Sequence, residues 1–253
     1  MVALAETLSP DIETSSEQYA TRFSGGVGRC FLDRQAKLVA SLIRQHPAGS
    51  LRILDVGGGH AQLTPTFLSL GHEVWVHGTH PSCEQQLLKL KERGEKIRFV
   101  VSPLSALPFP AESFDVVTSF RLLAHLDDAR EFIEVLTRVA RRQVIFDYAP
   151  LCSFNALSPV LFSLKKRIEG NTRPFHCHTF RELRRELARC DFGQARALRQ
   201  FFMPMGVHRA LDNPNFTQTV ESGFEKIGLT QTFGSPVIVS AYRKKRGGES
   251  RDG

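Results

Sequence analysis

No apolar run in this 253-residue chain approaches the roughly 20 residues that a membrane-spanning helix needs. Its first residues also lack the basic and then apolar order of a secretory signal, because they carry acids at Glu6, Asp11, Glu13 and Glu17. The five cysteines are scattered and odd in number, which argues against a disulfide framework. We therefore expect a cytoplasmic protein without an integral membrane segment.

The basic surplus of the chain, a formal net charge of +7, has no pattern typical of nucleic-acid binding. Basic residues lie mainly beside acids on predicted helices or in the tail at 243–246, and no aromatic residues alternate with them. An anionic small-molecule substrate explains the surplus equally well. The hydrophobic fraction of 42% suits a globular domain, and no residue pattern specifies an oligomeric state.

The most informative segment is 51–59, an apolar run that reaches Asp55 and opens into three consecutive glycines. The apolar residues that follow, among them Leu63 and Phe67, have helical spacing up to Gly71. A strand, a glycine turn and a helix in this order are typical of a nucleotide-binding unit. The spacing does not match the G-x-G-x-x-G fingerprint of dinucleotide-binding proteins.

Further strands and helices alternate along the chain. Strands are predicted at 71–76, 96–101, 114–119, 143–146, 195–203 and 236–242. Helices are predicted at 15–23, 31–44 and 215–227 and from Thr179, which with Glu182 has the pattern of a capping box. This alternation predicts a parallel sheet with helices on both faces.

Two segments resemble motifs of the class I S-adenosylmethionine (SAM)-dependent methyltransferases. Asp55 and the three glycines are similar to the first motif, and 107–117 is similar to the L-P-F-x-x-x-x-F-D-x-V stretch of that family. The landmarks follow the family's order over about 19–150. The resemblance implies a doubly wound α/β fold with a mostly parallel seven-stranded sheet, the last strand antiparallel, and S-adenosyl-L-methionine as cofactor.

The resemblance also suggests how the chain is divided. We expect 1–14 to be loosely attached and 24–28 to be flexible. The expected parts are an N-terminal segment and lid at 1–30, a SAM-binding core at 31–149, a helical insertion over the substrate at 150–178, the rest of the core sheet at 179–243, and a disordered basic tail at 244–253.

The resemblance implies a cofactor site around the glycine turn, formed by Asp55, Gly57, Gly58 and Gly59. A branched side chain, as in Gly58→Val, would then take the ligand's space and leave the fold intact. The segment at 19–23 matches a Tyr-x-x-Arg-Phe pattern of related N-terminal segments, so that Tyr19 and Arg22 would meet the methionine carboxylate. The alternative is that the aromatic residues of this segment simply pack its helix.

Two acids that the family normally carries are missing. The acid at the end of the second strand, which takes the ribose hydroxyls, is replaced by Gly78, and the acid after the third strand by Pro103. We expect instead that Thr79 or His80 contacts the ribose. The adenine would be served by Ser102 or by the backbone of Leu104. Restoring an acid by Gly78→Asp should then tighten SAM binding.

Candidate residues for the acceptor follow the fourth and fifth strands, where open parallel sheets bind ligands. Arg121 or Arg173 would pair with an anionic group, and His125, His176 or Tyr148 would orient or deprotonate the attacking atom; Asp147 and His178 are further candidates. The apolar residues at 201–205 would line the pocket or belong to the core.

Each candidate has a plainer interpretation. His125 could fasten its loop, and Arg121 could pair with Asp127 or Asp128 on the surface. His176 and His178 flank Cys177, but this spacing matches no usual zinc site, so we expect no metal.

The leading hypothesis is methyl transfer to a small molecule with an apolar body and an anionic or hydroxyl end. A methyltransferase-fold binding protein that has lost SAM catalysis is the alternative, because of Gly78 and Pro103. A nicotinamide oxidoreductase is disfavoured by the glycine spacing and the absent ribose acid.

Overall fold

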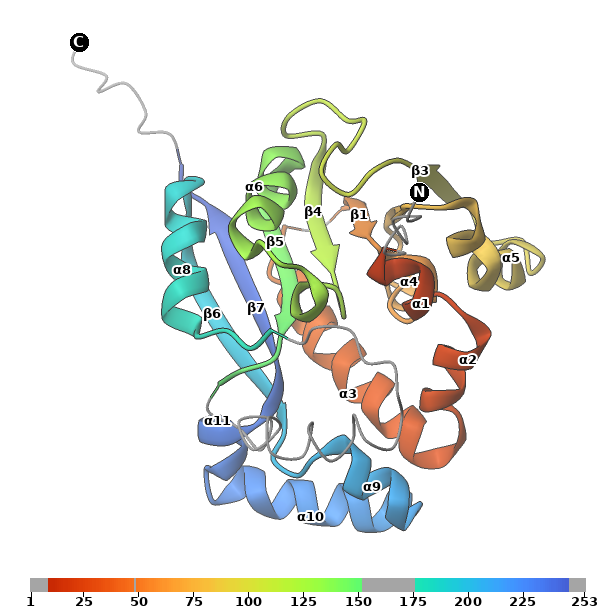
Figure 1. The fold of residues 1–253 in the computed structure, drawn as a ribbon, viewed down its shortest axis with the longest axis vertical. Coiled ribbons are helices and arrows are strands. Elements are labelled where there is room, and N and C mark those ends of the chain that lie inside the picture. Colours follow the sequence, from red (N-terminus) through yellow and green to blue (C-terminus); the bar gives the residue numbers. More distant parts are fainter. Residues whose placement is uncertain (1–8, 48, 152–175, 246–253) are drawn as a thin grey trace, which may run out of the picture.

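The computed structural model describes residues 9–47, 49–151 and 176–245 (Figure 1). Its sheet has seven strands in the order β3-β2-β1-β4-β5-β7-β6. The strands are β1 Arg52–Val56, β2 Glu73–Gly78, β3 Ile97–Val101, β4 Phe114–Ser119, β5 Ala140–Tyr148, β6 Phe192–Phe201 and β7 Ser235–Arg243. Only β7 runs antiparallel to its neighbours β5 and β6. The predicted mostly parallel, seven-stranded α/β fold is confirmed.

Strands β1 and β4 are buried on both faces, as expected of strands in the middle of the sheet. Every residue of β4 is buried, and in β1 only Arg52 is exposed. Strands covered on both sides read as nearly continuous apolar runs. The sheet is therefore enclosed between two helical layers.

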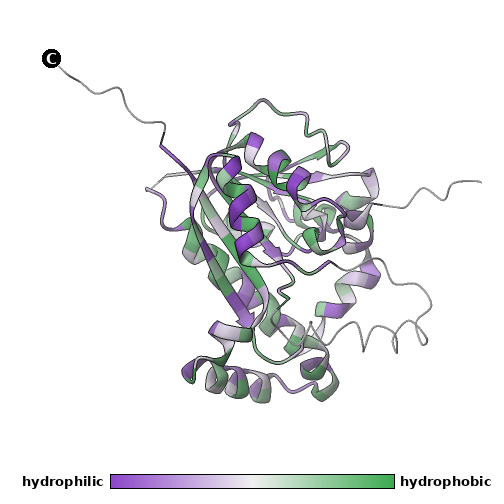
Figure 2. Ribbon diagram, turned by 60° about the vertical axis from the view of Figure 1, so that its left-hand side comes forward, coloured by the Kyte–Doolittle hydropathy of each residue, from purple (hydrophilic) through white to green (hydrophobic). Residues whose placement is uncertain are grey.

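Helices α3 Gly25–Ile43, α4 Thr64–Ser69 and α5 Gln85–Lys91 cover one face, and α6 Ala129–Val139 and α8 Phe180–Arg189 cover the other. Each layer has its own apolar cluster with the sheet, one around Phe67 and the other around Leu136. Hydrophilic and hydrophobic residues alternate along these helices (Figure 2). This alternation is what a helix with one buried face requires.

Helix α8 begins where the sequence predicted. Thr179 accepts a hydrogen bond from the backbone N–H of Glu182, and the Glu182 carboxylate accepts one from the backbone N–H of Thr179. Leu183 and Leu187 are buried on its inner face. The capping box is confirmed.

The expectation that 1–14 is loosely attached is wrong for the part that the structure describes. Residues Pro10–Thr14 form helix α1, in which Asp11 and Thr14 are buried. Helix α2 Glu17–Ala20 and a short 3-10 turn follow. The segment at 24–28 is not a flexible linker either, because α3 starts at Gly25 and buries Val27. Tertiary packing stabilises both segments.

The C-terminal part adds three helices between β6 and β7, namely α9 Met205–Leu211, α10 Pro214–Lys226 and α11 Leu229–Phe233. The sequence predicted α10 and missed the other two. Most of the expected insertion at 150–178 lies outside the described residues. No helix of the described residues is long and apolar enough to cross a membrane.

Strands β2 and β3 lie on one side of β1, and β4 and β5 lie on the other. The strand order therefore reverses between β1 and β4, which are neighbours in the sheet. A crevice forms at such a point, beyond the carboxyl ends of the strands, and it is where open α/β sheets bind ligands. The glycine turn after β1 and the loops after β4 and β5 meet at this edge.

Candidate functional site

The glycine turn follows β1 and is packed against other parts of the protein. Gly57 has a left-handed backbone, φ 68°, which glycine adopts without strain. A Cβ atom at Gly57 would overlap the side chain of Leu122, and one at Gly58 would overlap the Asp55 carboxyl group. At Gly59 it would overlap the carbonyl of Cys83. All three glycines are needed by the protein's own packing.

This packing corrects the reasoning behind Gly58→Val. A side chain at position 58 would push on Asp55 before it reached a ligand. The variant would therefore disturb the turn itself and is not a clean test of ligand binding.

Asp55 lies fully buried behind the turn. Its Oδ1 accepts a hydrogen bond from Thr118 Oγ1 at 2.8 Å, and its Oδ2 has no partner among the described residues. Burial raises the pKa of the carboxyl to about 7, although the Thr118 hydrogen bond opposes this. A buried acceptor without a donor costs free energy and is suited to receive a donor from a ligand.

His60 closes the turn and stays neutral. Burial, together with the positive charge of Arg121, lowers its pKa to about 3. Its Nδ1 accepts a hydrogen bond from the backbone N–H of Gln62 at 3.2 Å. The turn thus carries a neutral imidazole beside a buried carboxyl group.

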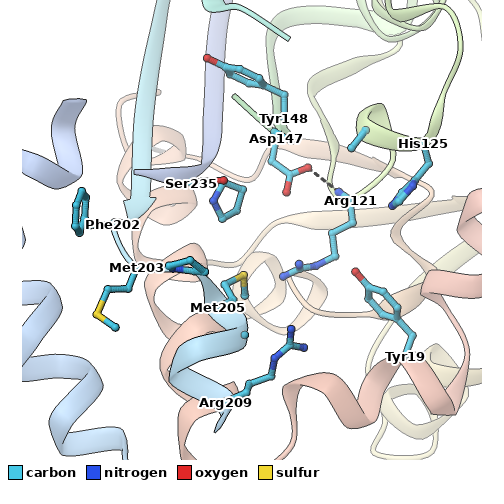
Figure 3. A pocket seen from close by; sticks show the side chains of 15 residues that line it. Tyr19, Arg121, His125, Asp147, Tyr148, Phe202, Met203, Met205, Arg209 and Ser235 are labelled. Atoms are coloured by element: carbon cyan, nitrogen blue, oxygen red, sulfur yellow. Dashed lines mark hydrogen bonds between the residues drawn. The ribbon is translucent and has the colours of Figure 1, made fainter. Parts of the chain in front are cut away.

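Arg121 connects the glycine turn with the end of the sheet. Its Nε donates to Gln62 Oε1 at 2.7 Å and its Nη2 to Gln35 Oε1 at 3.0 Å, while its guanidinium lies 4.2 Å from the centre of the Phe23 ring. Its backbone N–H donates to Asp147 Oδ1 at 2.6 Å (Figure 3). The alternative that Arg121 pairs with surface acids is therefore wrong.

A pocket of about 380 Å³ opens beside Arg121. Its lining comes from α2, the loop after β4, the end of β5, the loop after β6, α9 and the start of β7, and includes both predicted candidates and residues that the sequence did not single out. They are Tyr19, Arg121, Ala124, His125, Asp147, Tyr148, Ala149, Phe202, Met203, Pro204, Met205, Gly206, Arg209, Ser235 and Pro236. The expected grouping of Arg121, His125 and Tyr148 with most of 201–205 is found here.

The charged groups of the pocket are two arginines and one acid. The guanidinium groups of Arg121 and Arg209 and the hydroxyl of Tyr19 point into the same space, and the Tyr148 ring points away from it (Figure 3). Burial, reinforced by the positive charges of Arg22 and Arg121, lowers the pKa of Arg209. Burial also raises the pKa of Asp147.

A buried network fixes the wall of the pocket that α9 and β6 form. Glu221 accepts hydrogen bonds from the backbone N–H groups of Phe202 and Met203 at 2.8 and 3.0 Å. It also contacts Nε2 of the fully buried His208 at 2.8 Å, whose Nδ1 lies 3.1 Å from Thr217 Oγ1. Helices α9 and α10 therefore hold the strand end in place.

Of the two N-terminal candidates, Tyr19 lines this pocket and Arg22 does not. Arg22 lies outside the lining, since its exposed guanidinium stacks on the Tyr19 ring and lies 3.8 Å from Glu13. Arg209, which the sequence did not single out, does line the pocket.

The structure differs most from the sequence prediction at the end of β2, where Thr79 or His80 was expected to contact the ribose. The backbone N–H and the hydroxyl of Thr79 both donate to the carboxylate of Asp11, each at 2.6 Å, and His80 caps the next turn through Ser82. A Cβ atom at Gly78 would lie 2.6 Å from the Cβ of Cys83 and 2.9 Å from Phe99. The proposed gain from Gly78→Asp is therefore wrong, because no space exists for the new side chain.

The candidates after β3 lie apart from the pocket beside Arg121. Ser102 Oγ lies 3.1 Å from His77 Nε2. Leu104 lines a separate pocket with Ser9 and Leu126.

Of the candidates in the expected insertion, the described residue His176 is not in the pocket lining. His176 fastens the loop after β4, since its N–H donates to the Ala124 carbonyl at 2.7 Å and its Nε2 lies 3.3 Å from Asp127. Arg173 and Cys152 lie outside the described residues. No group of three potential metal ligands occurs in the ranges that the structure describes.

Four residues of the site were missed by sequence reasoning, namely Asp11, Gln35, Gln62 and Arg209. Asp11, Gln35 and Arg209 lie far in sequence from the glycine turn, so no local spacing marks them, whereas Gln62 directly follows the turn. The one available signal was the position of Arg209, shortly after the apolar run at 201–205.

A crevice at the switch point, a glycine turn after β1 and a pocket at the strand ends are typical of α/β proteins that bind nucleotide-like ligands. Residues 54–146 match the family of the methyltransferase domain. The matched residues are fewer than half of the chain, and the seven-stranded sheet has the topology of the class I SAM-dependent methyltransferase fold.

Two curated relatives are similar over part of the chain. An uncharacterised methyltransferase of Bacillus subtilis is 30% identical over 105 residues, which are 39% of this chain and 42% of that protein. An uncharacterised methyltransferase of Schizosaccharomyces pombe is 35% identical over 100 residues, 36% of each chain. The similarity thus spans less than half the length of either relative.

Solved structures resemble the chain over nearly its whole length. The magnesium protoporphyrin IX methyltransferase of Synechocystis PCC 6803, crystallised with bound S-adenosylhomocysteine (SAH), has a TM-score of 0.61 at 17% identity. The alignment covers 92% of this chain and 97% of that one. At this identity the likeness shows a shared fold.

The packing of the turn predicts a stability effect. We expect Gly58→Ala to lower the free energy of unfolding by about 1–3 kcal/mol, because the new methyl group overlaps the Asp55 carboxyl. The measurement is urea denaturation. As a control, Gly223→Ala on an open face of α10 should raise stability by about 0.5–1 kcal/mol. Equal stability of Gly58→Ala and wild type would contradict the packing of Asp55 against the turn.

The raised pKa of Asp55 predicts a pH dependence. The folded protein holds this proton up to about pH 7, whereas the unfolded chain releases it near the ordinary value of 3.8. The group therefore stabilises the ligand-free protein below its unfolded pKa, and this contribution is lost as the pH rises to about 7. Urea denaturation should show that wild type gains stability relative to Asp55→Asn when the pH falls from about 8 to about 5. A constant difference would refute the raised pKa.

Proposed function

We propose that the protein transfers a methyl group from SAM to a small molecule that has an anionic group and an apolar body. The observation that carries this proposal is the position of Arg121 within the methyltransferase fold. It is bonded to Gln62 beside the glycine turn and also lines the pocket at the strand ends. A cofactor at the turn and an acceptor in the pocket would therefore be neighbours.

The residues at the turn fit the charged methionine part of SAM. The buried Oδ2 of Asp55 lacks a donor, and an ammonium group or a bridging water would supply one. A neutral His60 adds no competing positive charge. When bound, SAM would supply a methyl group on a sulfonium sulfur. The acceptor atom would attack that methyl carbon in line and displace the sulfur.

The pocket fits an anion. Within the described ranges, the guanidinium of neither Arg121 nor Arg209 forms an ion pair, and the side-chain hydrogen bonds of Arg121 are made to the neutral amides of Gln62 and Gln35. Like charges gathered in a partly buried site are unfavourable until an anion joins them. The apolar side chains of Phe202, Met203 and Met205 would contact the rest of the acceptor.

The chain's own contribution to the reaction is mainly positioning. Holding two reactants in line can supply much of the acceleration of a displacement. Arg209 and Arg121 would orient the acceptor, and His125 or Asp147 would take its proton when the attacking atom arrives protonated. His176 supports the loop that carries His125 and serves the site indirectly.

Cofactor binding is tested by calorimetry with SAH, SAM and NAD. We expect SAH and SAM to bind and NAD not to bind. Asp55→Asn should weaken SAH by about 10- to 100-fold, the range for a lost hydrogen bond to a charged group. Asp33→Asn, an exposed change on α3, is the control. If wild type binds neither SAH nor SAM, the methyltransferase proposal fails and a binding protein without SAM catalysis takes its place.

The acceptor class is tested with a matched pair of probes, 1-naphthaleneacetate and 1-naphthaleneacetamide, titrated in the presence of SAH. Wild type should prefer the acid by about tenfold, as one charge-assisted hydrogen bond allows. Arg209→Gln should remove this preference and leave SAH affinity unchanged, whereas the exposed Arg184→Gln should change neither. Equal binding of acid and amide to wild type would exclude an anionic acceptor.

A further inference from the structure

Helix α1 lies across two parts of the surface that the nucleoside of SAM would need. It contacts the 3-10 turn Gly58–His60, where Ser15 at its end lies beside Gly59. It also reaches the end of β2, where Asp11 bonds Thr79. The sequence predicted a loosely attached segment here, whereas the structure has a helix whose Asp11 and Thr14 are buried.

The carboxylate of Asp11 is fully engaged. Oδ2 accepts from the Thr79 N–H at 2.6 Å and from Cys83 Sγ at 3.4 Å, and Oδ1 accepts from the Thr79 hydroxyl at 2.6 Å. The residue is 1% exposed. Burial would raise the pKa of this carboxyl, but hydrogen bonds from Ser9, Thr79 and Cys83 outweigh it and hold the pKa below its ordinary value. Asp11 is thus an ionised, internally satisfied group.

Both hydrogen-bond donors of Thr79, its backbone N–H and its hydroxyl, are engaged by Asp11. The predecessor of Thr79 is Gly78, the position at which the strand lacks a ribose-binding acid and has no room for one. The donors at this strand end are therefore already bound to a carboxylate from another part of the chain.

We propose that α1 is an internal competitor for the nucleoside part of the cofactor site, with Asp11 occupying the strand end in place of the ribose. The inference rests on the proposed function. Cofactor binding then requires that the bonds between Asp11 and Thr79 open. The apparent affinity is reduced by the fraction of molecules in which they are closed.

The test compares SAH affinity in wild type, Asp11→Asn and Glu13→Gln by calorimetry. Asn keeps the shape but weakens acceptance, so Asp11→Asn should bind SAH about tenfold tighter or more. Glu13→Gln removes the same charge from an exposed position of α1 and should bind as wild type does. Asp11→Ala serves as a second variant in which the carboxyl group is removed altogether.

Amide hydrogen exchange gives a second readout. Saturating SAH should increase exchange in α1 of wild type, and Asp11→Asn should show the same increase without ligand. Weaker SAH binding by Asp11→Asn would overturn the proposal and make Asp11 itself the ribose-binding carboxylate. Equal binding, or α1 protected in the presence of bound SAH, would also overturn it.

Failure of the two proposals is distinguishable. If no variant binds SAH or SAM while α1 is released in Asp11→Asn, the methyltransferase function has failed and α1 has no nucleoside to exclude. If all variants bind SAH with one affinity, the function stands and the competition does not.

Discussion

The arrangement of the site depends on one buried carboxyl group, that of Asp55. It sits at the end of a strand that is covered on both faces, and the glycine turn folds against it so closely that position 58 admits no side chain. Thr118 on the neighbouring strand satisfies one of its oxygens and leaves the other without a donor. The close packing of the turn, the hydrogen bond between β1 and β4 and the unsatisfied oxygen behind the turn therefore all involve the same carboxyl group.

From this point the site is extended by contacts between distant segments. Arg121, in a left-handed conformation with φ 64°, turns its backbone N–H to Asp147 and its side chain to Gln62 and Gln35. It thereby joins the loops after β1 and β4 with strand β5 and helix α3. A single side chain positions the boundary between the proposed cofactor and acceptor sites.

The C-terminal helices give the acceptor side its shape. The buried pair of His208 and Glu221 holds the end of β6 through two backbone hydrogen bonds, and Arg209 projects from the same helix toward the pocket. A buried polar network that is satisfied in this way fixes one arrangement of a wall. The wall of the pocket therefore depends on α9 and α10 as much as on the sheet.

The sequence by itself determined the sheet, the capping box of α8 and the glycine turn, because these depend on apolar periodicity and on local hydrogen bonds between residues close in the chain. It also indicated that Arg121, His125 and Tyr148 would meet, since the ends of parallel strands share one edge. Only the tertiary structure decided that Asp11 bonds Thr79 and that Arg209 rather than Arg22 enters the pocket. Asp11 and Thr79 are far apart in sequence, and contacts of that kind are set by how α1 and α9 pack, which no local pattern encodes.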